Sequence, residues 1–168
     1  MRALGFLVNQ FSATPNGMQK KPVSALETHL GYWLRLVSNN VSGAFAEKLS
    51  GRKVSVAEWV VLRELYEADQ SPSLLAHKIG MTRGAITKLA DRLVARKLVA
   101  REASDRDGRA QILLLTGRGR AFVPQLAALA DRNDAEFFAG LSPHEQAMLK
   151  SLLLKIVRGR DLRGMPTE

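Results

Sequence analysis

The feature that most constrains the fold is a pair of short helix signals joined by one glycine turn. Ser71 followed by Pro72 is typical of a helix start, and Gly80 suits the left-handed position just after a helix end. Thr82 comes two residues later and can cap a second helix, which we expect to run to about Lys97. Two short helices separated by so tight a turn predict a helix-turn-helix.

A β-hairpin is predicted directly after this pair. Residues 99–103 and 110–115 are short and either apolar or alternating, which is typical of strands rather than helices. The segment between them, 104–109, is polar and contains Gly108, a residue that accepts a positive φ. We therefore expect a hairpin with a charged tip.

Three further segments show a Ser followed three residues later by Glu, the pattern of a reciprocal helix cap. These pairs are Ser24 with Glu27, Ser55 with Glu58 and Ser142 with Glu145. An apolar stripe at helical spacing follows the first pair, from Leu26 to Phe45. Thr116 caps another long helix, and the last helix is expected to end near Arg160. The stripe and the apolar last helix have no obvious partner in so small a chain except a second copy.

The positive charge of the chain is concentrated in one region. The formal net charge is +9 over 168 residues, and residues 82–120 hold ten basic and four acidic side chains, a net of +6. Such a local excess favours a polyanionic partner over a general solubility role. The chain has no Cys, which excludes disulfides, zinc ribbons and thiol catalysis and is compatible with the cytoplasm. No apolar run is long enough to cross a membrane.

The second helix of the pair can present two different faces. At 100° per residue, the apolar side chains gather on one side: Ala85, Ile86, Leu89, Ala90 and Leu93. The opposite side collects Gly84, Thr87, Lys88, Asp91 and Ala95, with Arg83 and Arg92 at its edges. This division suits a helix that packs on its own domain and enters the major groove of DNA. For the helix alone, a solvated amphipathic helix would be the default, but the preceding helix and the basic hairpin belong to the same module.

The order of these motifs resembles the multiple-antibiotic-resistance regulator (MarR) family of winged-helix transcription factors. The resemblance extends from about Leu26 to Val157 and rests on residues 59–65, 75–80, 82–93, 97–99, 107–110, 115–116 and Gly119. It implies a mainly α fold with a small β-hairpin wing (α+β). The expected organisation is a winged helix-turn-helix lobe at 51–116, a helical dimerisation region at 24–50 and 117–160, and tails at 1–23 and 161–168.

The same resemblance implies partners and ligands. These are double-stranded DNA with a pseudo-palindromic operator, a second copy of the chain, and a small effector, often an aromatic acid, bound between the dimerisation region and the DNA-binding lobe. No cofactor, metal or membrane is expected. The predicted DNA-contacting residues are Ser71, Ser73, Thr82, Arg83, Thr87, Lys88, Arg92, Arg106, Asp107 and Arg109. The candidate effector residues are His29, Trp33 and Trp59, although both Trp side chains also fit a core role.

Several roles are distinguished within this set. Arg92 is interpreted as a phosphate clamp, and Asp107 as the residue that orients Arg109 toward the minor groove. Ser71 fits a helix cap as well as a phosphate contact. Asp91 would be repelled by DNA, so we expect it to pair with an arginine of the chain itself.

Other classes of function explain less of the sequence. The three His residues, His29, His77 and His144, fall on different predicted helices without a nucleophile motif, which disfavours an enzyme or a zinc-responsive regulator. A helical protein–protein interaction module accounts for the apolar stripes but leaves the basic segment unexplained. A constitutive or architectural DNA-binding protein remains an alternative. The predicted function is therefore a homodimeric DNA-binding regulator, a repressor released by a small effector.

Overall fold

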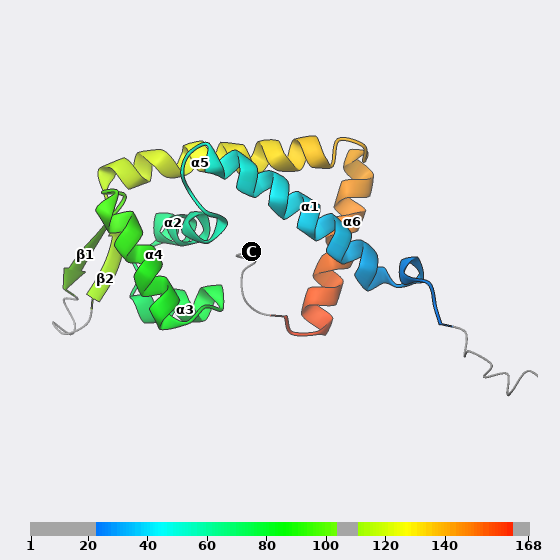
Figure 1. The fold of residues 1–168 in the computed structure, drawn as a ribbon, viewed down its shortest axis with the longest axis horizontal. Coiled ribbons are helices and arrows are strands. Elements are labelled where there is room, and N and C mark those ends of the chain that lie inside the picture. The colour runs from blue at the N-terminus through cyan, green and yellow to red at the C-terminus, as the bar shows by residue number, and fades with distance from the viewer. Residues whose placement is uncertain (1–22, 104–110, 163–168) are drawn as a thin grey trace, which may run out of the picture.

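The computed structural model describes residues 23–103 and 111–162. Its elements follow in the order η1 (Leu26–Thr28), α1 (Leu30–Ser50), α2 (Val56–Glu67), α3 (Pro72–Ile79), α4 (Arg83–Ala95), β1 (Val99–Ala103), β2 (Gln111–Leu115), α5 (Gly117–Phe137) and α6 (Pro143–Gly159). The predicted fold class, mainly helical with a two-stranded hairpin, is confirmed (Figure 1).

Two of the three predicted Ser–Glu caps form. At α2 the Ser55 hydroxyl accepts from the Glu58 backbone N–H and the Glu58 carboxylate accepts from the Ser55 N–H. At α6 Ser142 and Glu145 make the same exchange, with Pro143 in the first helical position. Hydrogen bonds from Ser142 lower the pKa of Glu145, because they stabilise its ionised form.

The cap predicted at Ser24 is wrong. A three-residue 3₁₀ turn precedes the first long helix, and α1 begins only at Leu30, after His29 in an extended conformation. The hydroxyl of Thr28 donates to the Ala25 carbonyl at 2.7 Å, which closes this short turn locally. A side chain at Ser24 therefore has no helix start beside it to cap.

The buried core lies in the lobe formed by α2, α3, α4, the hairpin and the first turns of α5. Its fully buried side chains include Leu62, Leu65, Leu75, Ile86, Leu93, Leu113 and Leu126. The hairpin is antiparallel, with Val99 opposite Leu115 and Ala103 opposite Gln111. Gln70 adds an isolated bridge to Leu113, with N–H···O distances of 3.1 and 2.9 Å. The bridge at Gln70 is not predicted from the sequence, because a single extended residue shows no alternation of apolar and polar side chains.

The remaining helices extend away from the lobe. The C-terminal half of α1 packs against α5, where Lys48 pairs with Glu136 at 2.8 Å and the buried Asn133 amide donates to the Val41 carbonyl at 3.3 Å. α6 lies apart from the lobe at the far end of α5 (Figure 1). None of the residues of α6 is buried, and its exposed apolar side chains include Met148, Leu152, Leu153, Ile156 and Val157.

Trp33 does not lie in a core within the single chain. Its side chain is 47% exposed, and exposed apolar residues accompany it on α1: Leu30, Leu34, Leu36 and Val37. Its indole N–H donates to the Glu27 carbonyl at 2.8 Å, and its ring contacts Tyr32 edge to face.

Within the described residues, no helix is long and apolar enough to span a membrane.

Candidate nucleic-acid interface

Helices α3 and α4 form the predicted helix-turn-helix. The Ser71 hydroxyl accepts from the Leu74 N–H at 3.2 Å and caps α3, which ends at Gly80 with φ 78°. After Met81, the Thr82 hydroxyl caps α4 by accepting from the Ala85 N–H at 3.2 Å. Glycine is needed at position 80 because residues with a side chain rarely adopt this φ. The turn therefore fixes the direction of α4 relative to α3.

The two faces of α4 are those predicted from the helical projection. Ile86, Leu89, Ala90 and Leu93 are buried against the lobe. The exposed face holds Arg83, Gly84, Thr87, Lys88, Asp91, Arg92 and Ala95. Because the apolar side is fully used in packing, the polar side is the only one that α4 can offer to a partner.

The acidic residue on this face is neutralised internally. Asp91 accepts from the Arg101 guanidinium on β1 at 2.6 Å, which confirms the expected pairing with an arginine. Arg83 and Lys88 have no ion-pair partner among the described residues. The exposed face of α4 is consequently a positively charged surface whose single carboxylate is already engaged.

Arg92 forms an ion pair with Glu58 of α2. The Glu58 side chain is only 8% exposed, and its Oε1 accepts from Arg92 Nε at 3.1 Å. Its Oε2 caps α2 at the Ser55 N–H, 2.9 Å away, and lies 3.9 Å from Arg96 Nη1. The terminal nitrogens of Arg92 donate no hydrogen bond within the described residues, and the side chain is 60% exposed. Glu58 thus orients an arginine that remains available to a partner.

From the sequence, Glu58 is predicted only as part of a helix cap. Its second role depends on α2 and α4 packing together, and the two residues are 34 positions apart in the chain. A local signal did exist: Glu58 stands in a helix turn whose other side chains are apolar. A buried carboxylate in such a place requires a cationic partner.

The remaining predicted contacts fall into three groups. Ser73 is exposed at the start of α3, whereas the Ser71 hydroxyl already acts as a cap acceptor. The hydroxyl of Thr87 donates to the Arg83 carbonyl at 2.9 Å within α4. The wing residues Arg106, Asp107 and Arg109 lie outside the described residues, so their assignment stays a prediction.

A cavity of about 570 Å³ lies between α1, α2 and α5. Trp59 lines it and contacts Phe45 edge to face, with 6.3 Å between the ring centroids. Its charged lining consists of one cation, Arg63, which is paired with Glu67, and the carboxylates of Glu64, Glu67 and Asp134. Of the three candidate effector residues, only Trp59 lines this cavity; His29 and Trp33 do not, because both lie near the start of α1.

Comparison with known proteins agrees with this architecture. The family model described as the MarR family matches residues 53–110. The structure of a mutant of Escherichia coli MarR complexed with operator DNA is 28% identical, with a TM-score of 0.69 over 76% of this chain and 93% of that one. The salicylic acid complex of the MarR family protein Rv2887 from Mycobacterium tuberculosis is 31% identical, with a TM-score of 0.63 over 76% and 96%. The chain belongs to the MarR family.

A third relative of this MarR-family protein is BpsR of Bordetella bronchiseptica. The two are 26% identical, with a TM-score of 0.71 over 80% of this chain and 97% of BpsR. The BpsR structure concerns the regulation of its DNA binding by 6-hydroxynicotinic acid.

Among the described residues of the present protein, no group of three or more His, Cys, Asp or Glu side chains could hold a metal ion.

Proposed function

We propose that this MarR-family protein is a homodimeric transcriptional repressor that binds a pseudo-palindromic operator and acts by binding rather than by catalysis. The observation that carries the proposal is the exposed face of α4, on which Arg83, Lys88 and Arg92 are presented while Asp91 is engaged by Arg101. Such a face meets the phosphates and base edges of a major groove without a competing carboxylate. The relative bound to operator DNA supports this use of the fold. A protein that represses genes in this way would act in the cytoplasm.

Dimerisation is supported by the exposed apolar residues of α1 and α6. A monomer rarely leaves so many large apolar side chains on two neighbouring helices, and their burial in a second copy would stabilise the pair. A two-fold axis would place two α4 helices on one side of the dimer. The operator would then have two half-sites about one helical turn of DNA apart.

The first experiment selects bound sites from random DNA at a stated salt concentration and then titrates the selected site. We expect an inverted repeat, and at least about a tenfold loss of affinity for Arg83→Gln combined with Lys88→Gln. The variant should also show a weaker dependence of affinity on salt, because fewer counterions are released.

The matched control removes two arginines, one from the loop between α1 and α2 and one from the start of α5. Arg52→Gln combined with Arg118→Gln lowers the net charge equally, yet we expect it to bind the operator within about twofold of the parent protein. Equal losses in both variants would show that overall charge, and not the face of α4, governs binding. If the selection yields no preferred DNA sequence, the result would favour an architectural DNA-binding protein instead.

We further propose that a small aromatic acid binds in the cavity beside Trp59 and releases the DNA. The apolar walls formed by Trp59, Val60 and Phe45 suit an aromatic ring, and Arg63 can meet a carboxylate once it exchanges its ion pair with Glu67 for the ligand. The relatives that bind salicylic acid and 6-hydroxynicotinic acid support this ligand class.

Tryptophan fluorescence tests the effector site. With Trp33→Phe, the emission reports Trp59 alone, and salicylate and 6-hydroxynicotinate should quench it in a saturable way. Adding Arg63→Gln should weaken binding about tenfold, since it removes a charge-assisted hydrogen bond. Arg132→Gln, on an exposed part of α5 outside the cavity lining, should leave binding unchanged. A flat titration across a broad set of aromatic acids would favour a constitutive regulator.

A further inference from the structure

A second cavity, which we call the shoulder cavity, lies where the α1–α2 loop meets the end of α4 and the start of α5. Its volume is also about 570 Å³, and it shares no lining residue with the cavity beside Trp59. Its charged lining consists of Arg52, Lys53, Arg96 and Arg118, without a carboxylate, and its apolar wall includes Leu98 and Phe122. Four cations around one cavity repel one another, so an anion placed among them would be strongly attracted.

Arg96 is held in a fixed position inside this cluster. Its Nη1 donates to the Lys53 carbonyl at 2.6 Å and its Nη2 to the Arg52 carbonyl at 3.3 Å. The nearest carboxylate, Glu58, is 3.9 Å away and already bound to Arg92 at 3.1 Å. The loop therefore orients one guanidinium without neutralising it.

The other three cations are free to bind a ligand. In the described part of the chain, the side chains of Arg52, Lys53 and Arg118 make no hydrogen bond or ion pair. Lys53 has a φ of 56°, in the left-handed region that residues with a side chain rarely adopt. Arg118 and Arg120 stand in the first turn of α5, where no acidic residue offsets the positive end of the helix. Arg52, Lys53 and Arg118 thus carry their charge without an ion-pair partner among the described residues.

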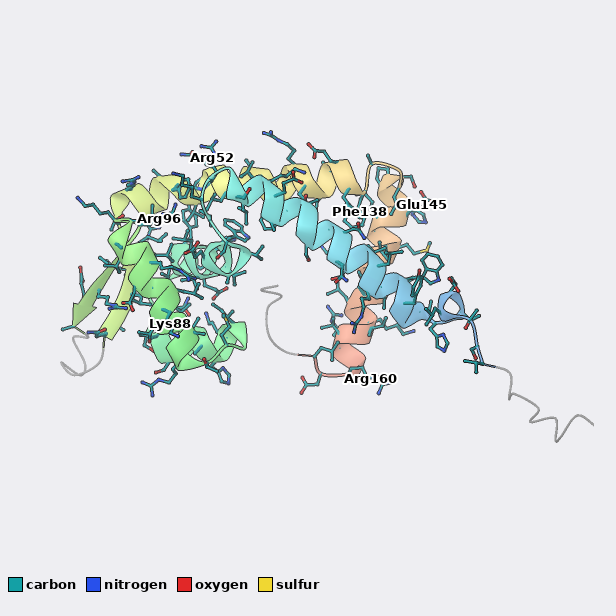
Figure 2. All side chains as sticks on the ribbon, in the orientation of Figure 1. Arg52, Lys88, Arg96, Phe138, Glu145 and Arg160 are labelled. Carbon is teal, nitrogen blue, oxygen red and sulfur yellow. The ribbon has the colours of Figure 1, made fainter. Side chains whose placement is uncertain are left out.

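The shoulder cavity is distinct from the proposed DNA-binding face. Figure 2 places Arg52 and Arg96 close to the junction of α4 with α5, and Lys88 farther along α4 toward α3. Lys88 and Arg96 are separated by eight residues, or about 12 Å along a helix. The basic residues of the cavity are therefore not needed to explain the contacts of α4 with DNA.

We propose that the shoulder cavity binds a small organic anion that carries two or more negative charges next to an apolar group. Arginine guanidinium groups fit phosphate and carboxylate oxygens in pairs, which matches the charge of the lining. The Phe122 and Leu98 wall provides a surface for a ring or hydrocarbon group. The volume is in the usual range for small-molecule sites. This inference goes beyond the proposed repressor function and does not depend on it.

Isothermal titration of the full chain with phenyl phosphate at low ionic strength tests the proposal. We expect saturable binding, weakened at least about tenfold by Arg52→Gln combined with Arg118→Gln. Arg83→Gln combined with Lys88→Gln removes the same charge from the other surface and should change the affinity by no more than about twofold. Inorganic phosphate, which lacks the ring, should bind more weakly than phenyl phosphate.

Three outcomes would overturn the proposal. Titration without saturable heat would show that there is no site, and equal weakening in the two double variants would show attraction to overall charge alone. Loss of binding in Arg63→Gln, with full binding in the Arg52 and Arg118 variant, would place the ligand in the cavity beside Trp59 instead. Thermal melting of each variant verifies that the affinities compare folded proteins.

Discussion

Gly119→Ala is expected to lower the free energy of unfolding by about 3 kcal/mol or more, a large part of the stability of an ordinary domain. Gly119 is buried in the first turn of α5, where a Cβ atom would lie 2.0 Å from the Leu98 carbonyl oxygen and 3.0 Å from its carbonyl carbon. The obstacle is backbone, held by the Thr116 N–H at 3.1 Å from the same oxygen, so it cannot rotate away. The hairpin and α5 would have to separate.

Gly117→Ala is the matched control for this substitution. Gly117 is on the same helix two residues earlier, and an added Cβ there has no other atom within 4 Å. Alanine should be neutral or stabilising by up to about 1 kcal/mol, because it restricts the unfolded chain and favours the helix. Urea unfolding monitored by circular dichroism gives both values. Similar midpoints for the two variants would show that α5 does not pack on the Leu98 backbone in this way.

Leu152→Glu combined with Ile156→Glu is expected to convert the proposed dimer into a monomer of 18.5 kDa. Both residues are on α6, where they are 54% and 48% exposed in the single chain. Burial of two carboxylates in an apolar interface is strongly unfavourable, so the two copies should separate. Because each monomer would hold only one half-site, we expect operator affinity to fall by at least about a hundredfold.

The control places the same two charges on a different side of α6. Ala147→Glu combined with Ser151→Glu keeps the spacing of four residues but lies beside Lys150, Lys155 and Arg158. This variant should remain dimeric and bind DNA within a few-fold of the parent protein. Light scattering after size exclusion measures the mass, and gel-shift titration measures the affinity. Monomers from both variants, or dimers from both, would contradict the assigned interface.

The elements that were correctly predicted depend on interactions between near neighbours. Thr82 and Thr116 cap the helices that follow them, Gly80 ends α3, and the apolar spacing of α4 gives its buried face. Each of these signals operates within about four residues, so one sequence is enough to read them. The cap predicted at Ser24 also rests on a local pattern, but there the chain forms a short 3₁₀ turn before α1 begins at Leu30. A cap motif predicts a helix start only where the following chain continues as a helix.

The helix-turn-helix, the hairpin and the concentration of positive charge near them can be read from the sequence, because they follow from local propensity and composition. How that charge is arranged depends on contacts between segments that are far apart in the chain. These contacts pair Asp91 with Arg101, place Glu58 behind Arg92, and bring the Arg52–Lys53 loop against Arg96 and Arg118. These partners are 10 to 44 positions apart in the bonded pairs, and no local pattern relates them. Folding therefore keeps part of the basic segment on the face of α4 and brings Arg96 and Arg118 of that segment together with Arg52 and Lys53 at a separate cavity.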